Sequence, residues 1–220
     1  MERNMTHASA AEVRRAAILA AAIHVLSSEG INDTTTRKIA AAAGINQATL
    51  LYHVGSKDEL LLAVLREMMR LTGEVARRVL IAGLSPRAAI RHSITAFWQH
   101  VEATPELQVM QYELTLYALR HGGSAWLARE QYAGYGAVVE ELLRETFTAA
   151  GARCALPFPA LARFIVGGLD GLILQFISDR DSVRARCDLE TLIAAVIALA
   201  EGTAPSLGAE ESVGTQAQRA

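Results

Sequence analysis

The chain has 220 residues, 51% of them hydrophobic, so it can bury a core in one large or two modest domains. Its formal net charge of −2 argues against a general nucleic-acid coat protein, which would carry a strongly basic surface. The only positive region is N-terminal. Residues 1–57 hold six Lys and Arg against four Asp and Glu, whereas residues 58–220 hold fifteen against nineteen.

The two cysteines, Cys154 and Cys187, stand alone, with neither a C-x-x-C spacing nor a nearby pair of His residues. They fit free thiols in a reducing cytoplasm better than a metal site or a structural disulfide. The sequence has no unbroken run of about 18 apolar residues and no N-terminal signal-peptide core. We therefore expect a cytoplasmic protein that uses no membrane, metal ion or cofactor.

The first expected element is a helix that runs from Ser9 to about Ser28. Ser9 and Glu12 have the S-x-x-E spacing of a capping box, which satisfies backbone N–H groups at a helix start. Such a helix can pack across the two short helices that follow. Its apolar stripe consists of Ile18, Ala21, Ala22 and Val25.

Residues 34–57 are expected to form two short helices joined by a tight turn and followed by the start of a third. Thr35 or Thr36 can cap the first helix. Gly44 can end it, because glycine readily adopts the left-handed conformation of a C′ position. Asn46 is a good N-cap for the second helix.

The second short helix has one apolar and one polar side. Leu50 and Val54 are four residues apart and share the apolar face, whereas small and hydrogen-bonding residues occupy the others. An apolar seam opposite such a face is typical of a recognition helix that enters the DNA major groove. Ser56 and Glu59 then form a capping box that begins the next helix.

This segment resembles the helix-turn-helix of TetR-type transcriptional repressors in residue type and spacing, and it lies near the N-terminus as in that family. Ile45, Asn46 and Val54 are close replacements for the residues of the family pattern, and two further departures matter. Leu51 stands where a Tyr often contacts phosphate, with Tyr52 beside it, and Gly55 replaces a Pro or similar residue. The matching residues are Thr35, Ile39, Ala40, Ala43, Gly44, Thr49, Leu50, Ser56 and Lys57.

The resemblance implies a three-helix DNA-binding domain over residues 1–55 and a body over residues 56–203 that binds an effector and dimerises. Residues 204–220 are small and polar, and we expect a disordered tail. By position in the motif, the resemblance also implies which residues contact the bases or phosphates of double-stranded DNA. These are Thr36, Arg37, Asn46, Gln47, Ala48, Thr49, Tyr52, His53 and Lys57.

From Ser56 the sequence is helical almost to its end, with prolines and glycines at most helix boundaries. With the three N-terminal helices, this makes nine helices and no strand, an all-α fold. Ser124 is expected to cap the fourth helix of the body and Asp188 to open the last. The six body helices are expected over residues 57–81, 86–103, 105–120, 124–150, 160–178 and 188–201.

Most aromatic residues lie between positions 97 and 135, and large aromatics with a few polar tips are typical of a ligand cavity. Glu113 and Asp170 each interrupt an apolar run, so each carboxylate must be paired, solvated or facing a ligand. Ordinary core packing and paired structural carboxylates are the alternatives. The expected effector pocket comprises Trp98, Met110, Tyr112, Glu113, Leu116, Tyr117, Trp126, Tyr135 and Asp170, with Tyr132 nearby.

The last two helices are expected to form the dimer interface, because one is rich in small residues and the other is apolar on nearly all sides. Paired with a two-fold mate, they would form a four-helix bundle. The alternative is that the last helix is central in the monomer core. The expected interface residues are Phe164, Gly167, Gly168, Gly171, Gln175, Ile193, Val196 and Ile197.

Together these features predict a ligand-responsive transcriptional regulator, most simply a repressor that binds a near-palindromic operator as a dimer. A small apolar or amphipathic effector would release it by shifting the long helix that leads out of the head. A helical enzyme and a protein-binding adaptor are the rival classes, and activation is open as well as repression. The sequence has no G-x-S-x-G, H-E-x-x-H, phosphate-loop or dinucleotide motif on which an enzyme could be built.

Overall fold

The computed structural model describes residues 10–78 and 83–204. Within these ranges the chain forms nine α-helices and no strand, which confirms the predicted all-α fold. The helices are α1 (Ala10–Asp33), α2 (Thr36–Ala42), α3 (Gln47–Val54), α4 (Lys57–Arg78), α5 (Pro86–Ala103), α6 (Pro105–Arg120), α7 (Ala125–Ala149), α8 (Phe158–Asp179) and α9 (Ser182–Glu201).

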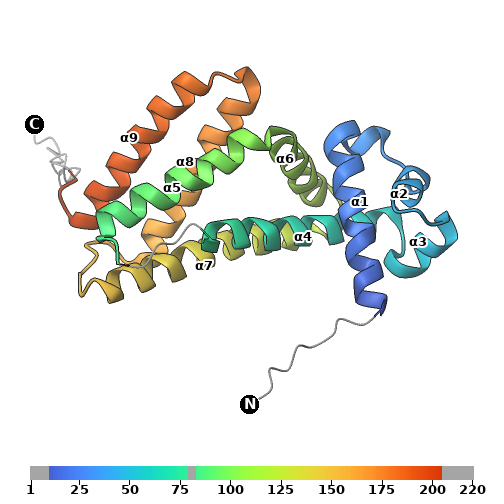
Figure 1. Cartoon of the computed structure of the whole chain (residues 1–220), viewed down its shortest axis with the longest axis horizontal. Helices are drawn as coiled ribbons and strands as arrows, with labels where there is room; N and C mark the ends of the chain where they lie inside the picture. The colour runs from blue at the N-terminus through green and yellow to red at the C-terminus, as the bar shows by residue number, and fades with distance from the viewer. Residues whose placement is uncertain (1–9, 79–82, 205–220) are drawn as a thin grey trace, which may run out of the picture.

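The molecule is elongated (Figure 1). Helices α1, α2 and α3 gather at one end and form the head, whereas α5, α8 and α9 lie toward the other end and belong to the body. Helix α7 runs alongside α4 and continues along the body toward the end opposite the head (Figure 1). Helices α4 and α6 lie between these two groups, and α4 leads from the head directly into the body (Figure 1). A displacement along α4 therefore has a continuous path to the helices of the head.

The short helices of the head begin at the caps that the sequence predicts. The Thr35 side chain accepts a hydrogen bond from the backbone N–H of Lys38, and the Asn46 side chain accepts one from that of Thr49 at 2.7 Å. Gly44 follows α2 with φ of +67°, in the left-handed region that favours glycine.

The predicted capping box at the start of α4 is also present. The Ser56 backbone N–H donates to Glu59 Oε2 at 2.8 Å, and the Glu59 backbone N–H donates to Ser56 Oγ at 3.2 Å. Gly55 precedes the box with φ of +77°, and a Cβ built there would lie 2.2 Å from Glu59 Oε2. The Pro-to-Gly departure from the family pattern therefore matches a backbone conformation that only glycine adopts readily.

Two hydrophobic clusters organise the packing. The head core joins α1, α2 and α3 to the first half of α4, and it also takes in Met110, Leu114 and Ala118 of α6 and Leu127 of α7. The body core joins α5, the second half of α7, α8 and α9. The domain boundary expected at residues 55 and 56 thus passes through the head core, which draws on residues from the body helices.

Several helix boundaries differ from the sequence predictions. α9 begins at Ser182 instead of Asp188, because Asp181 caps it by accepting from two backbone N–H groups; Asp188 instead pairs with Arg184 at 2.7 Å. Ser124 makes no side-chain capping bond. The predicted cap at residue 9, the helix end near residue 81 and the tail from residue 205 onward lie outside the described residues.

Candidate functional site

Helix α3 presents two different faces. Leu50 and Val54 are buried in the head core, with Leu50 completely inaccessible to solvent. Gln47, Ala48 and Tyr52 are exposed, and 86% of Tyr52 is accessible, an unusual exposure for a large aromatic side chain. The helix thus presents a small, hydrogen-bonding surface to the outside, backed by an apolar seam.

The remaining predicted DNA contacts around the turn are held by local hydrogen bonds. Gln47 Nε2 donates to Thr36 Oγ1 at 2.9 Å, which joins the first turn of α3 to the first turn of α2. The backbone N–H of half-buried Thr49 donates to Asn46 Oδ1 in the helix cap, so Asn46 also stabilises the start of α3. Arg37 is exposed on α2.

His53 and Lys57 lie where the recognition helix meets the rest of the head. The His53 ring contacts the Tyr52 ring edge-on, with centroids 5.3 Å apart, and its carbonyl accepts from Arg15 Nη1 at 3.1 Å. Lys57 Nζ donates to the carbonyl oxygen of Ile31 at 3.2 Å. Lys57 therefore anchors the end of α1, and Arg15 is an added cation beside α3 that no motif had singled out.

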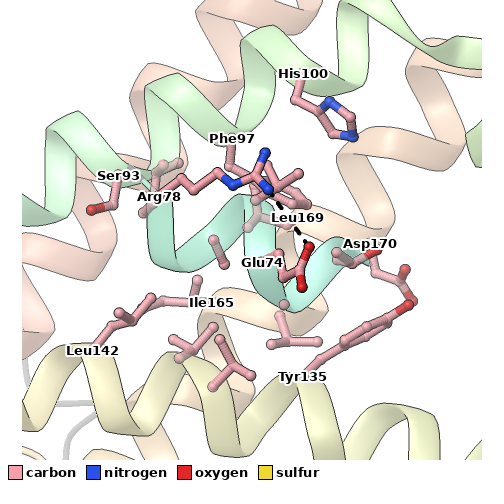
Figure 2. Close-up of a pocket in the computed structure, with 18 of the residues that line it drawn as sticks. Glu74, Arg78, Ser93, Phe97, His100, Tyr135, Leu142, Ile165, Leu169 and Asp170 are labelled. Carbon is pink, nitrogen blue, oxygen red and sulfur yellow. Dashed lines mark ion pairs between the residues drawn. The ribbon is translucent and has the colours of Figure 1, made fainter. Parts of the chain in front are cut away.

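A cavity of about 300 Å³ lies in the body, at the junction between the two hydrophobic cores. Five helices line it, from α4 to α8, and its walls are mostly apolar. Figure 2 shows apolar side chains such as Leu142, Ile165 and Leu169 around it. A cavity of this size and character is suited to a small molecule.

A few polar groups interrupt the apolar wall of this cavity. Glu74 and Arg78 of α4 form an ion pair at 3.7 Å, drawn as a dashed line in Figure 2, and Glu74 also pairs with Arg70. Burial lowers the pKa of His100, which favours its neutral form. The α4 carboxylate is thus balanced by two guanidinium groups.

Asp170 of α8 is held differently, by hydroxyl groups. Tyr112 donates to Asp170 Oδ1 at 2.8 Å, and Tyr132 donates to Oδ2 at 2.7 Å. Burial, and then the Asp170 carboxylate, raise the pKa of Tyr112 and of Tyr132 above the ordinary value, so both phenols stay protonated. Burial likewise raises the pKa of Tyr135, whose hydroxyl end points toward Asp170 in Figure 2.

Of the nine residues expected in the effector pocket, Tyr135 and Asp170 line this cavity. Tyr112 reaches it only through its bond to Asp170. Trp98 and Met110 are buried in the body core and the head core, respectively. Leu116 and Trp126 are each about half exposed, at 53% and 42%.

Glu113 and Tyr117 also lie away from the cavity, on the side of α6 that faces the head. Glu113 Oε2 accepts from the backbone N–H of Ile31 at 3.2 Å, and Tyr117 donates to Asp58 Oδ1 at 2.5 Å. The prediction failed here because aromatic content along the chain does not indicate which face of α6 points inward. It also missed Glu74, which a helix-face analysis of α4 could have located.

The predicted dimer residues of α8 divide into two groups. Phe164, Gly167, Gly171 and Gln175 are exposed on one stripe, and a Cβ added at either glycine would meet no atom within 4 Å. Gly168 faces α9 instead, where an added Cβ would lie 2.5 Å from a methyl group of Leu192. Gly168 is therefore a contact within the protomer.

The structure corrects the prediction that three residues of α9 lie in the dimer interface. Ile193, Val196 and Ile197 are buried in the body core, at most 4% exposed, so the alternative of a central core helix describes them. Apolarity on nearly all sides could not distinguish burial by α5 and α8 from burial by a second copy. By length and composition alone α8 could also cross a membrane, but Leu161, Ile165 and Leu169 pack in the body core.

Within the described residues, no group of three or more His, Cys, Asp or Glu side chains is placed to hold a metal ion. Cys154 is half-buried and Cys187 is exposed, and both are free thiols.

The chain thus combines a helix-turn-helix at one end with a cavity at the junction of the two hydrophobic cores. Residues 18–64 match the sequence family described as "Bacterial regulatory proteins, tetR family". The matched residues run from α1 through α2 and α3 to the start of α4, so the chain is similar to this family over its helix-turn-helix segment.

The HTH-type nicotine-responsive transcriptional repressor HdnoR of Paenarthrobacter nicotinovorans is 28% identical over 180 residues, which cover 80% of this chain and 90% of HdnoR. The HTH-type transcriptional regulator BetI of Paraburkholderia phymatum is 34% identical over 86 residues, 39% of this chain and 44% of BetI. Among solved structures, the multidrug binding protein EbrR complexed with imidazole has a TM-score of 0.63 and 24% identity, covering 89% of this chain and 97% of EbrR. The structural likeness indicates a shared fold.

Proposed function

We propose that this chain binds a near-palindromic operator as a homodimer and that a small amphipathic effector in the cavity releases it. The observation that carries the proposal is the position of the cavity between the two cores. Met68 of the head core and Ile90 and Ile94 of the body core line it together. A ligand that contacts both cores favours one arrangement of them over another, which is what a switch requires.

The recognition surface consists of Gln47, Ala48, Thr49 and Tyr52 on α3. The exposure of Gln47, Ala48 and Tyr52 opposite buried Leu50 supports insertion of α3 into a major groove. In the dimer, two such helices enter successive grooves about 34 to 36 Å apart. The backbone-contacting groups are Thr36, Arg37, Asn46, His53 and Lys57.

Dimerisation uses the exposed stripe of α8. Phe164 is 43% exposed and Leu174 is 55% exposed, so a monomer leaves large apolar side chains in water. The open surface at Gly167 and Gly171 permits close approach of a second helix. Pairing around a two-fold axis covers this stripe in both copies and forms a four-helix bundle with α9.

The signal passes from cavity to head along two helices, α4 and α6. In α6, Leu107 and Gln111 line the cavity. The next turns carry Glu113, which bonds to Ile31 of α1 in the head, and Tyr117, which bonds to Asp58 at the start of α4. Glu113 and Lys57 hold the N–H and the carbonyl of Ile31, respectively, so both helices grip the end of α1.

A shift of α4 or α6 on ligand binding therefore moves the head directly. A coupling of about 1–3 kcal/mol between the two sites changes DNA affinity from several-fold to about a hundredfold.

A gel shift with the DNA that flanks the gene of this protein tests the proposal. We expect Gln47→Ala to lose discrimination among operator variants, by about 1–3 kcal/mol at the base that Gln47 contacts. Lys57→Ala should weaken binding to all sequences and reduce the salt slope by about one. Arg129→Ala, at an exposed position of α7, serves as the control.

Repeating the shift with a panel of small molecules tests the effector, beginning with nicotine because HdnoR is nicotine-responsive. If Gln47→Ala and Lys57→Ala both bind an operator as the parent does, the assignment of α3 as the reading helix is wrong. Sedimentation of the free protein as a monomer at micromolar concentration would contradict the dimer.

A further inference from the structure

The two carboxylates that line the cavity differ in how their charge is balanced. Glu74 pairs with Arg70 and Arg78, so its charge is compensated on the protein. Among the described residues Asp170 makes no ion pair, and its hydrogen-bond partners, Tyr112 and Tyr132, are neutral hydroxyl groups. A carboxylate in a mostly apolar wall is costly unless it is compensated, and hydroxyl donors leave its charge in place.

Tyr112 and Tyr132 hold the Asp170 carboxylate in place but do not occupy all of its hydrogen-bond acceptor positions. A carboxylate offers about four acceptor positions, and the hydroxyl groups of Tyr112 and Tyr132 use one on each oxygen. Tyr112 also donates to the Asp170 carbonyl oxygen at 3.0 Å, which ties its ring to the backbone of α8. Asp170 lines the cavity, and about two of its acceptor positions are left over after these two bonds.

Aromatic rings stand next to the same carboxylate. The Tyr135 ring lines the cavity, and the Tyr132 ring meets it edge-on, with centroids 6.3 Å apart and planes at 83°. The faces of tyrosine rings are electron-rich and attract organic cations, most strongly where water is excluded. A carboxylate beside such rings matches a substituted ammonium group, whose charge is spread over apolar carbons.

We propose that Asp170, held by Tyr112 and Tyr132, forms with the ring of Tyr135 the subsite for the charged head of an organic monocation, such as a quaternary or tertiary ammonium with an apolar body. This inference rests on the proposed function of the cavity as the effector site and specifies the ligand class. The apolar walls of α5, α7 and α8 take the body of the ligand, and Asp170 takes the charge.

The charges of the other residues that line the cavity favour a cationic ligand over an anionic one. Arg78 is the one Lys or Arg among its described lining residues, and it pairs with Glu74. His100 is kept neutral by burial, so it offers no positive charge. An anionic ligand would meet the uncompensated carboxylate of Asp170 with no free cation to offset it.

Calorimetric titration of the full-length protein without DNA tests this inference with three ligands of matched size. Benzyltrimethylammonium carries the cation, neopentylbenzene is its neutral isostere, and 4-phenylbutyrate is an anion. We expect the cation to bind about tenfold or more tightly than either of the others. The readout is direct binding, so it does not depend on finding the operator.

A substitution then assigns the preference to Asp170. Asp170→Asn keeps the shape and an acceptor for the tyrosine hydroxyls but removes the charge, so we expect the cation affinity to fall about tenfold and the affinity for the neutral isostere to hold. Glu130→Gln, which removes an exposed carboxylate from α7, is the matched control and should leave all three affinities unchanged. Melting curves by circular dichroism verify that each variant is folded.

The inference is overturned if the parent protein does not bind benzyltrimethylammonium, or binds it no more tightly than neopentylbenzene. Undiminished cation affinity in folded Asp170→Asn would overturn it as well. The ligand comparison uses the parent protein, so it is decisive even if Asp170→Asn does not fold. If the cation binds through Asp170 but no cationic ligand releases DNA, the subsite stands and the proposed effector function fails.

Discussion

The head and the cavity are built from hydrogen bonds of very different range. In the head, Thr35 bonds to Lys38 and Asn46 to Thr49, each across three positions. At the cavity, Asp170 is bonded across 58 positions to Tyr112 and across 38 positions to Tyr132. The helix starts of the reading surface are therefore set within a short segment, although Arg15 also bonds to His53 across 38 positions, whereas the cavity exists only when helices such as α6, α7 and α8 pack together.

This difference suits the two tasks. A surface that reads DNA gains from local rigidity, because base contacts require fixed side-chain positions. A switch gains from a site whose geometry depends on how several helices sit, because a ligand can then shift that arrangement. The joint at Ile31, held by Glu113 of α6 and Lys57 of α4, connects the two.

The largest effects on stability should come from substitutions that each remove a buried side chain from one of the two hydrophobic cores. Leu50 and Ile193 are completely buried, one in the head core and one in the body core. Leu50→Ala and Ile193→Ala should each cost about 2–5 kcal/mol, from lost burial and a residual cavity. We expect Leu50→Ala to abolish operator binding while ligand binding persists, and Ile193→Ala to weaken ligand binding first.

Calorimetry and gel shifts on both variants measure this separation. If each substitution lowers the melting temperature of one single shared transition and impairs both activities equally, the two cores form one cooperative unit and the comparison fails.

A substitution on the open stripe of α8 should have the next largest effect. Gly171→Arg places a charged side chain on an open helix surface, so the monomer fold should hold while pairing is blocked. We expect sedimentation to shift from dimer to monomer. Operator affinity should fall by more than about tenfold, because the two DNA-binding heads are no longer linked in one molecule. Ala133→Arg, at an exposed position of α7, should change neither.

The joint between the two regions should respond more mildly. Glu113→Ala removes the acceptor for the Ile31 N–H and should cost about 1.5–3 kcal/mol, the range for a hydrogen bond to a charged group. Because this bond connects α6 to α1, we expect the ratio of operator affinities without and with effector to shrink. Glu106→Ala, on the same helix and 63% exposed, is the control, and an unchanged ratio in Glu113→Ala would remove Glu113 from the coupling route.

The smallest expected effect is a pH dependence at the same joint. Burial, followed by the bond to Asp58, raises the pKa of Tyr117 to about 12. A raised folded-state pKa contributes stability that is complete below the unfolded value, near pH 10, and is lost as pH rises through the folded value. The difference in melting temperature between the parent and Tyr117→Phe should therefore shrink between pH 9 and about pH 12; a constant difference would contradict the role of this phenol.

The helix starts and the turn of the head could be predicted from residue type and spacing, because their signals are local. Helix caps at Thr35, Asn46 and Ser56 and the turn at Gly44 act within three or four residues, so residue type and spacing are enough to predict them. The number of helices follows for the same reason, since prolines, glycines and capping residues act at each boundary.

Packing was needed to learn which residues line the cavity and which remain exposed on the surface of the protomer. An apolar helix looks the same in sequence whether a neighbouring helix or a second copy covers it, so Ile193 and Val196 could not be assigned without the packing. Likewise Glu113 and Asp170 interrupt similar apolar runs, yet one bonds to the end of α1 and the other lines the cavity. Their roles depend on contacts between residues far apart in the chain, which spacing along one helix does not encode.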